Sequence, residues 1–276
     1  HTDWVNSLII NKDNELISGS FEEIKIWNLT TGQVKRTLTG HNSWIWSLEI
    51  NKDNELVSGS ADTTIKIWNM TTEEEKRTLT GHTWSVLSLV INKDNELISG
   101  SGDKTIKIWN MTTGEIIKTL IGHGSGIWSL VVRQNNELVS GSSDNTIKIW
   151  NMKTGELKKT LNGHTGWVMS LAINEKNNEI ISGSRDKTIK IWNITTGQIR
   201  KSLAVHNGSI DTLAINENNE LISGSVFGIK ILNMTTGEVK RTFSGQTDWV
   251  CLLVVNKDNK LISGSSDNTI KIWKQI

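Results

Sequence analysis

One unit recurs about every 41 residues along the chain, and this repeat restricts the fold more than any other feature of the sequence. The string Ile-Lys-Ile-Trp ends at Trp27, Trp68, Trp109, Trp150, Trp192 and Trp273, and a degenerate copy ends at Leu232. Consecutive copies are separated by 41, 41, 41, 42, 40 and 41 residues. Seven copies therefore fill the chain without a spacer, and we expect one domain over residues 1–276 made of stacked repeats.

Each unit contains four short runs typical of β-strands. In the second copy these runs are Trp46–Ile50, Glu55–Ser60, Ile65–Trp68 and Lys76–Leu79. They show a period of two, and Asn, Asp, Gly and Thr stand between them, where turns require such residues. No stretch of 11 residues has helical spacing. The pattern predicts an all-β fold, and four strands in about 41 residues match the size of a propeller blade.

Two motifs of the unit resemble the WD40 repeat. A Gly-His pair such as Gly40-His41 opens the unit, and Ile-Trp-Asn follows, with Trp68 standing 27 positions after His41. Asn69 occupies the place where that family usually has Asp. The resemblance covers essentially the whole chain and implies a seven-bladed β-propeller.

The strand count predicts an incomplete last blade. The first three strands of the unit occur seven times, whereas the fourth occurs six times, for example over Gln33–Thr39 and Glu238–Ser244. In WD40 propellers an outer strand from one terminus usually completes the last blade, and neither end supplies it here. We therefore expect one outer strand to be missing at the closure blade and Asn268–Trp273 to form an open edge. Either the chain is trimmed at both ends, or a partner adds the strand.

All six histidines stand in the same slot of the repeat, which allows a catalytic, a metal-binding or a structural role. The WD40 resemblance implies a buried network in which indole, serine, imidazole and turn aspartate are linked, because a buried Trp N–H needs a partner. The four complete sets are His41-Asp62-Ser58-Trp68, His82-Asp103-Ser99-Trp109, His123-Asp144-Ser140-Trp150 and His164-Asp186-Ser182-Trp192. The seventh copy offers Gln246, Asp267, Ser263 and Trp273. We expect the first copy to lack the aspartate and the sixth to lack the network, so that these two blades are the least stable.

Positions that vary among the copies are candidates for a binding surface. Seven tryptophans fall outside the Ile-Lys-Ile-Trp string, and WD40 domains place such positions around the mouth of the central channel. The candidate partner-binding residues are Trp4, Trp44, Trp46, Trp84, Trp128, Trp167, Arg185, Asp211 and Trp249. The alternative is that these indoles fill gaps between blades. Because the same columns also accept Gly, Asp and Ser, we favour binding.

Several classes of function are disfavoured by composition and by missing motifs. Thirty Lys and Arg against 29 Asp and Glu leave a net charge of +1, which argues against nucleic acid and membrane partners. Cys251 is the lone cysteine, and His1–Trp4 does not resemble a signal peptide, so we expect a reducing, cytoplasmic location. No nucleophile-elbow, phosphate-loop, dinucleotide or zinc pattern appears, so we expect no enzyme activity, no cofactor and no metal.

The resulting hypothesis is a non-catalytic scaffold or recognition module that binds a peptide or protein on the Trp-rich face around the channel. The alternative is a propeller that binds a small ligand, a sugar or a methylated cation, between stacked indoles. A sensor module of a larger receptor that resembles the NACHT–WD40 proteins also remains open.

Overall fold

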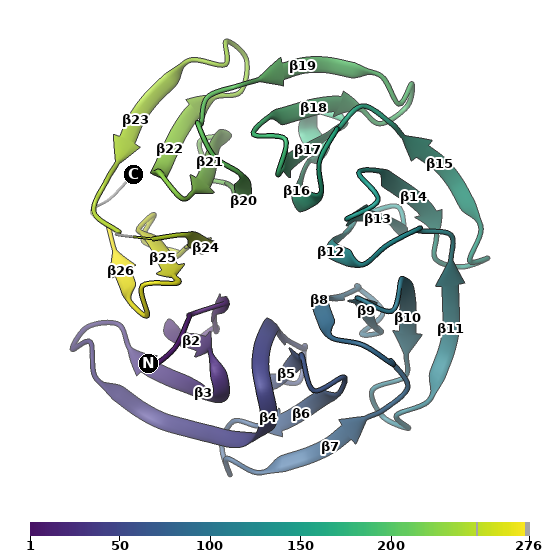
Figure 1. Ribbon diagram of the computed structural model, residues 1–276. Coiled ribbons are helices and arrows are strands. Elements are labelled where there is room, and N and C mark those ends of the chain that lie inside the picture. The colour runs from purple at the N-terminus through teal and green to yellow at the C-terminus, as the bar shows by residue number, and fades with distance from the viewer. Residues whose placement is uncertain (247, 274–276) are drawn as a thin grey trace.

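A computed structural model describes residues 1–246 and 248–273, which form seven antiparallel blades arranged in a ring around a central channel (Figure 1). Blades 1 and 2 belong to one seven-stranded sheet, because β4 (Val34–Ile50) runs through both. The first strand of each complete blade lies beside the channel and the fourth lies at the circumference (Figure 1). The seven-bladed all-β propeller predicted from the sequence is therefore confirmed. Its last blade has three strands among the described residues, and the missing fourth strand is the predicted one.

The strands follow the repeat. Blade 1 contains β1 (Ser7–Ile10), β2 (Glu15–Gly19), β3 (Phe21–Asn28) and the first part of β4 (Val34–Ile50). Blade 2 contains the second part of β4 with β5 (Glu55–Ser60), β6 (Ile65–Asn69) and β7 (Glu75–Leu79). Blade 3 contains β8 (Val86–Ile91), β9 (Leu97–Ser101), β10 (Thr105–Trp109) and β11 (Ile116–Ile121). Blade 4 contains β12 (Ile127–Val132), β13 (Glu137–Ser142), β14 (Ile147–Asn151) and β15 (Leu157–Leu161).

The second half of the ring repeats this order. Blade 5 contains β16 (Val168–Asn174), β17 (Glu179–Ser184), β18 (Ile189–Asn193) and β19 (Ile199–Leu203). Blade 6 contains β20 (Ile210–Ile215), β21 (Glu220–Ser225), β22 (Gly228–Asn233) and β23 (Val239–Phe243). Blade 7 contains β24 (Val250–Val255), β25 (Leu261–Ser265) and β26 (Ile270–Ile272). The 3-10 turn η1 (Glu175–Asn177) replaces the first turn of blade 5, where the repeat is one residue longer. No helix among the described residues has the length and apolar character needed to cross a bilayer.

The core lies between the blades because each blade packs one face against the preceding blade and the other against the following one. An aliphatic side chain of the next blade packs directly against the glycine of each Ser-Gly-Ser strand. A larger residue would clash there, because a Cβ on Gly59 would lie 2.7 Å from Cγ1 of Val86. The same packing joins the last blade to the first, where a Cβ on Gly264 would lie 2.9 Å from Cγ1 of Val5. The Val5 N–H also donates to the carbonyl of Ser265 at 3.2 Å. Blade 7 is thus packed on blade 1 through their inner strands.

Candidate functional site

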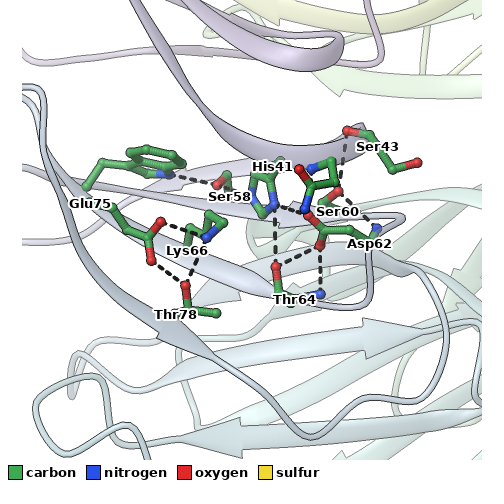
Figure 2. A network of polar contacts seen from close by, with 11 residues as sticks. His41, Ser43, Ser58, Ser60, Asp62, Thr64, Lys66, Glu75 and Thr78 are labelled. Atoms are coloured by element: carbon green, nitrogen blue, oxygen red, sulfur yellow. Dashed lines mark hydrogen bonds and ion pairs between the residues drawn. The ribbon is translucent and has the colours of Figure 1, made fainter.

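The predicted histidine network of blade 2 joins His41 of β4, Ser58 of β5 and Asp62 of the turn between β5 and β6 (Figure 2). In blade 2, Nε2 of His41 lies 2.7 Å from Ser58 Oγ, and Nε1 of Trp68 donates to the same oxygen at 2.8 Å. Nδ1 of His41 lies 2.7 Å from Oδ2 of Asp62. An ionised carboxylate only accepts, so Nδ1 carries the proton and Nε2 accepts from the Ser58 hydroxyl. The serine hydroxyl is therefore the centre of the network.

The aspartate of each network is held in its ionised form. Burial opposes ionisation of Asp62, but hydrogen bonds from His41 and Thr64 outweigh it and hold the pKa of this carboxyl well below its usual range. The pKa of Asp103 and that of Asp186 are lowered to about 2 against the same burial by hydrogen bonds from the turn threonine and the histidine. With the carboxylate ionised, the two oxygens of Asp62 accept from His41, from the Thr64 hydroxyl and from the N–H groups of Asn42 and Thr64, which fixes the geometry of the turn.

The four predicted sets repeat this arrangement with nearly identical distances. In blades 3, 4 and 5, the His Nε2 to Ser Oγ distance is 2.7 Å and the Trp Nε1 to Ser Oγ distance is 2.8 Å. The residues that take these roles are His82, Asp103, Ser99 and Trp109; His123, Asp144, Ser140 and Trp150; and His164, Asp186, Ser182 and Trp192. Burial lowers the pKa of His82 and of His164, which disfavours their protonated forms. These histidines have structural partners on both ring nitrogens.

The first copy lacks the aspartate, as expected, but a network still forms there, and the expectation that the sixth copy has no network is wrong. Blade 1 has a network in which Glu23 takes the place of the aspartate: His1 Nδ1 lies 2.8 Å from Glu23 Oε1 and Nε2 lies 2.6 Å from Ser18 Oγ. The turn is one residue shorter there, and the longer glutamate side chain spans the difference. Blade 6 keeps one bond of the network, since Nε2 of His206 lies 2.8 Å from Ser223 Oγ, while Nδ1 has no partner. The network of blade 6 is reduced rather than absent.

Blade 7 has a partial network among the described residues. Trp273 Nε1 donates to Ser263 Oγ at 2.8 Å, as in the other blades. Gln246 donates from Nε2 to the main-chain oxygen of Ser263 at 3.5 Å instead of bonding the hydroxyl. A glutamine at the histidine slot therefore does not reproduce the hydrogen bond between the imidazole and the serine hydroxyl.

The candidate partner-binding residues divide into two groups. A cavity of about 230 Å³ at the mouth of the channel is lined by Trp4, Trp46, Trp128, Arg185, Asp211 and Trp249. We call this the mouth cavity. The remaining three candidates, Trp44, Trp84 and Trp167, do not line it. Trp44 packs against Phe21 with ring centroids 5.3 Å apart, and Trp84 covers the backbone of Gly102.

The indoles of this face make edge and stacking contacts with one another. Trp128 meets Trp46 at 6.0 Å edge to face and Trp167 at 5.9 Å in a stacked arrangement. The guanidinium of Arg185 lies 3.9 Å above the Trp167 ring, which continues the stack. On the other side of the mouth, Trp4 and Trp249 lie 6.4 Å apart.

The mouth indoles differ from the network indoles in burial. Trp4, Trp167 and Trp249 are 37–42% exposed, whereas Trp109 and Trp192 are 1% exposed. Gap filling between blades requires side chains that are removed from water, so it does not describe these three indoles. Exposed aromatic side chains gathered at one opening are typical of an interaction surface.

Three side chains that line the cavity were not among the candidate binding residues, although they stand in one of the columns that vary among the copies. Leu87, Met169 and Cys251 line the mouth cavity from the same column of the repeat as Trp46 and Trp128, five positions after the histidine slot. Their shared column was the signal that could have identified them. Burial and, after it, the charge of Asp211 raise the pKa of the Cys251 thiol to about 12.

Another ionisable group, Glu49, stands on β4. Glu49 occupies a column that holds only apolar residues in the other copies: Ile9, Val90, Val131, Ala172, Ala214 and Val254. Burial raises the pKa of Glu49 to about 8. This carboxyl is therefore neutral over most of the range in which carboxylates are charged.

Comparison with protein families agrees with the repeat geometry. The WD domain, G-beta repeat model matches residues 32–69, 73–110, 114–151, 155–193 and 237–274, more than half of the chain. Most of blade 6, with its reduced network and Leu232, lies outside these matches. No curated protein matches the chain. The chain belongs to the WD40 repeat family.

Proposed function

We propose that this propeller is a non-catalytic recognition module that binds a segment of another protein across the mouth cavity and the indoles around it. WD40 repeats generally mediate protein–protein interaction, and proteins built from them are typically non-catalytic scaffolds. The observation that carries the proposal is the convergence of half-exposed indoles from blades 1, 2, 4 and 7 on one cavity. Tryptophan is the residue that most often anchors a protein interface, because a large rigid surface is buried at small entropic cost.

The size of the cavity favours a protein segment over a small ligand. At about 230 Å³ it is smaller than the roughly 300–1,000 Å³ usual for small-molecule sites. Exposed rings also continue beyond the cavity onto Trp167 and Trp44. A surface with one shallow cavity and flanking aromatic side chains fits an extended peptide with one inserted side chain.

The test is a selection of linear peptides from a display library on the full chain, followed by affinity measurements on variants. We expect Trp46→Ala and Trp249→Ala each to weaken the selected peptides about tenfold or more, since anchors contribute about 2 kcal/mol or more. Trp84→Ala is the matched control, because Trp84 is 66% exposed but does not line the cavity. Peptides that bind all three variants as well as the unchanged protein would contradict the proposal, as would selective binding of sugars without any peptide.

We also propose that an added β-strand pairs with β26. Among the described residues β26 pairs with β25 alone, and a cavity of about 150 Å³ beside it is lined by Trp27, Leu29, Ile270 and Ile272. In blades 2 to 5 a leucine of the preceding fourth strand, such as Leu79, lies in the same hydrophobic cluster as the equivalent indole. We expect a peptide copying 238–245 to raise the melting temperature of the protein, and a scrambled peptide to have no effect. Equal effects of the two peptides would contradict strand addition.

A further inference from the structure

One carboxylate oxygen in the mouth cavity has no hydrogen-bond partner. Oδ1 of Asp211 accepts from the Ser209 hydroxyl at 2.6 Å, whereas Oδ2 is buried and unpaired. A buried charge without a partner lowers the stability of the folded state, and folded proteins keep such a group mainly where it has a function. The six other copies have Asn6, Trp46, Leu87, Trp128, Met169 and Cys251 at this position. The scaffold therefore does not require an acid there.

Arg185, the one cation that lines the cavity among the residues described, does not form an ion pair with this acid. Arg185 is held on the Trp167 ring, and among the described contacts neither carboxylate oxygen of Asp211 pairs with it. Burial raises the pKa of Asp211, although Ser209 and the charge of Arg185 act in the opposite direction. Oδ2 of Asp211 therefore lacks a positively charged hydrogen-bond donor that would offset the cost of its burial.

Two further carboxylates, Asp248 and Asp267, act on the same residue as Asp211. The charges of Asp211, Asp248 and Asp267 all raise the pKa of the Cys251 thiol, so the three carboxylates act on one sector of the mouth, formed by blades 6 and 7. A field of this sign attracts cations and repels acidic side chains.

Aromatic rings complete a site for a cation. Trp46, Trp128 and Trp249 line the same cavity as Asp211. An indole face attracts an ammonium or guanidinium group within about 6 Å of its centre, and it also packs against the methylene groups of a lysine or arginine. The stacking of Arg185 on Trp167 shows that an indole of this face accepts such a group.

We propose that the mouth cavity takes one basic side chain, a lysine or an arginine, of the bound protein segment, whose charged group bonds Oδ2 of Asp211 and whose stem lies against the indoles. This inference rests on the proposed function, because it names the side chain that the recognition module inserts. An acidic side chain directed at Arg185 is the competing occupant, and it is disfavoured by the three carboxylates. A charge-assisted bond inside a partly dry cavity is stronger than a neutral one.

The experiment is a titration of the full chain with capped pentapeptides of glycine that carry one central residue, followed through the indole N–H signals of the tryptophans. The central residues are lysine, arginine, trimethyllysine, glutamate and norleucine, the last being a neutral analogue of lysine. We expect the lysine or the arginine peptide to bind about tenfold or more tightly than the norleucine peptide. Trimethyllysine, which keeps the charge without a donor N–H, separates the contribution of the indoles from that of Oδ2.

Asp211→Asn is the decisive variant because Asn6 occupies the same column in blade 1 and the fold accepts it. We expect the preference for the basic peptide to disappear in Asp211→Asn and to persist in Asp94→Asn, the matched control in an exposed turn at the opposite end of the strands. Preference for the glutamate peptide, an equal affinity for lysine and norleucine, or no signal change at about 10 mM, above the millimolar range of a weak site, would overturn the proposal. If selected partners lose affinity in Trp46→Ala but not in Asp211→Asn, the recognition function stands and this inference alone fails.

Discussion

Ser140→Ala removes the centre of one complete network, and its cost can be worked out from the structure. The Ser140 Oγ accepts from Trp150 Nε1 at 2.8 Å and lies 2.7 Å from His123 Nε2. Ser140 is 0% exposed, so neither nitrogen gains water as a partner when the hydroxyl is lost. An orphaned buried group costs about 1–3 kcal/mol, so two of them should lower the free energy of unfolding by about 2–6 kcal/mol.

Blade 6 supplies a matched control for this prediction. Ser223 is equally buried and lies 2.8 Å from His206 Nε2, but Leu232 stands where the other blades have tryptophan. Ser223→Ala therefore orphans one nitrogen and should cost about 1–3 kcal/mol. Urea unfolding followed by circular dichroism gives both values. If Ser140→Ala and Ser223→Ala have equal costs, the indole bond contributes nothing and the network argument is refuted.

Three further predictions concern pH and packing. The pKa of Asp103 and of Asp186 is about 2 in the folded protein and 3.8 in the unfolded chain. The free energy of unfolding should therefore decrease as the pH falls from about 4 to 2, which urea midpoints would measure. The pKa of Glu49 is about 8 in the folded protein instead of 4.5, so the folded state binds more protons than the unfolded state between these values. The free energy of unfolding should therefore decrease as the pH rises from about 4.5 to 8, and Glu49→Gln should reduce this pH dependence. Gly264→Ala places a Cβ 2.9 Å from Val5 and should destabilise the contact of blades 7 and 1 by about 1–3 kcal/mol, measured by thermal unfolding.

Each of these predictions has a result that contradicts it. A urea midpoint that is constant from pH 4 to 2 would show that the network aspartates have the same pKa in the folded and the unfolded chain. Identical pH profiles of Glu49→Gln and the unchanged protein would mean that water solvates this carboxyl in the channel. An unchanged melting temperature of Gly264→Ala would show that the inner strands yield enough to admit a methyl group.

The sequence was sufficient for the fold because the repeat supplied seven independent copies of the same evidence. The predicted run Glu55–Ser60 coincides with β5, and Lys76–Leu79 differs from β7 by one residue. The turn η1 was not predicted, because one inserted residue changes the hydrogen bonding of a turn without changing the hydrophobic pattern. Glu23 was missed for a similar reason: in a shortened turn a longer acid reaches the same histidine.

The candidate site was only partly predictable. The varying columns pointed to the mouth, but Trp44 and Trp46 are two residues apart and would share a face of a regular strand. A register shift in β4 between Ile45 and Ser47 separates them, so Trp46 lines the cavity while Trp44 packs on Phe21. Trp84 stands in the loop before β8 and covers Gly102, a neighbour that the repeat pattern does not specify. The unpaired oxygen of Asp211 depends on the side-chain positions of Ser209 and Arg185, which no spacing rule gives.

The most direct test of the recognition function is to map a selected peptide onto the protein through its indole N–H signals. The indoles of Trp46, Trp128 and Trp249 should shift at saturation, because they line the mouth cavity. Those of Trp109 and Trp150 should stay unchanged, since each is buried and bonded to a serine. Shifts confined to the outer strands, with the mouth indoles unaffected, would contradict recognition at the channel mouth.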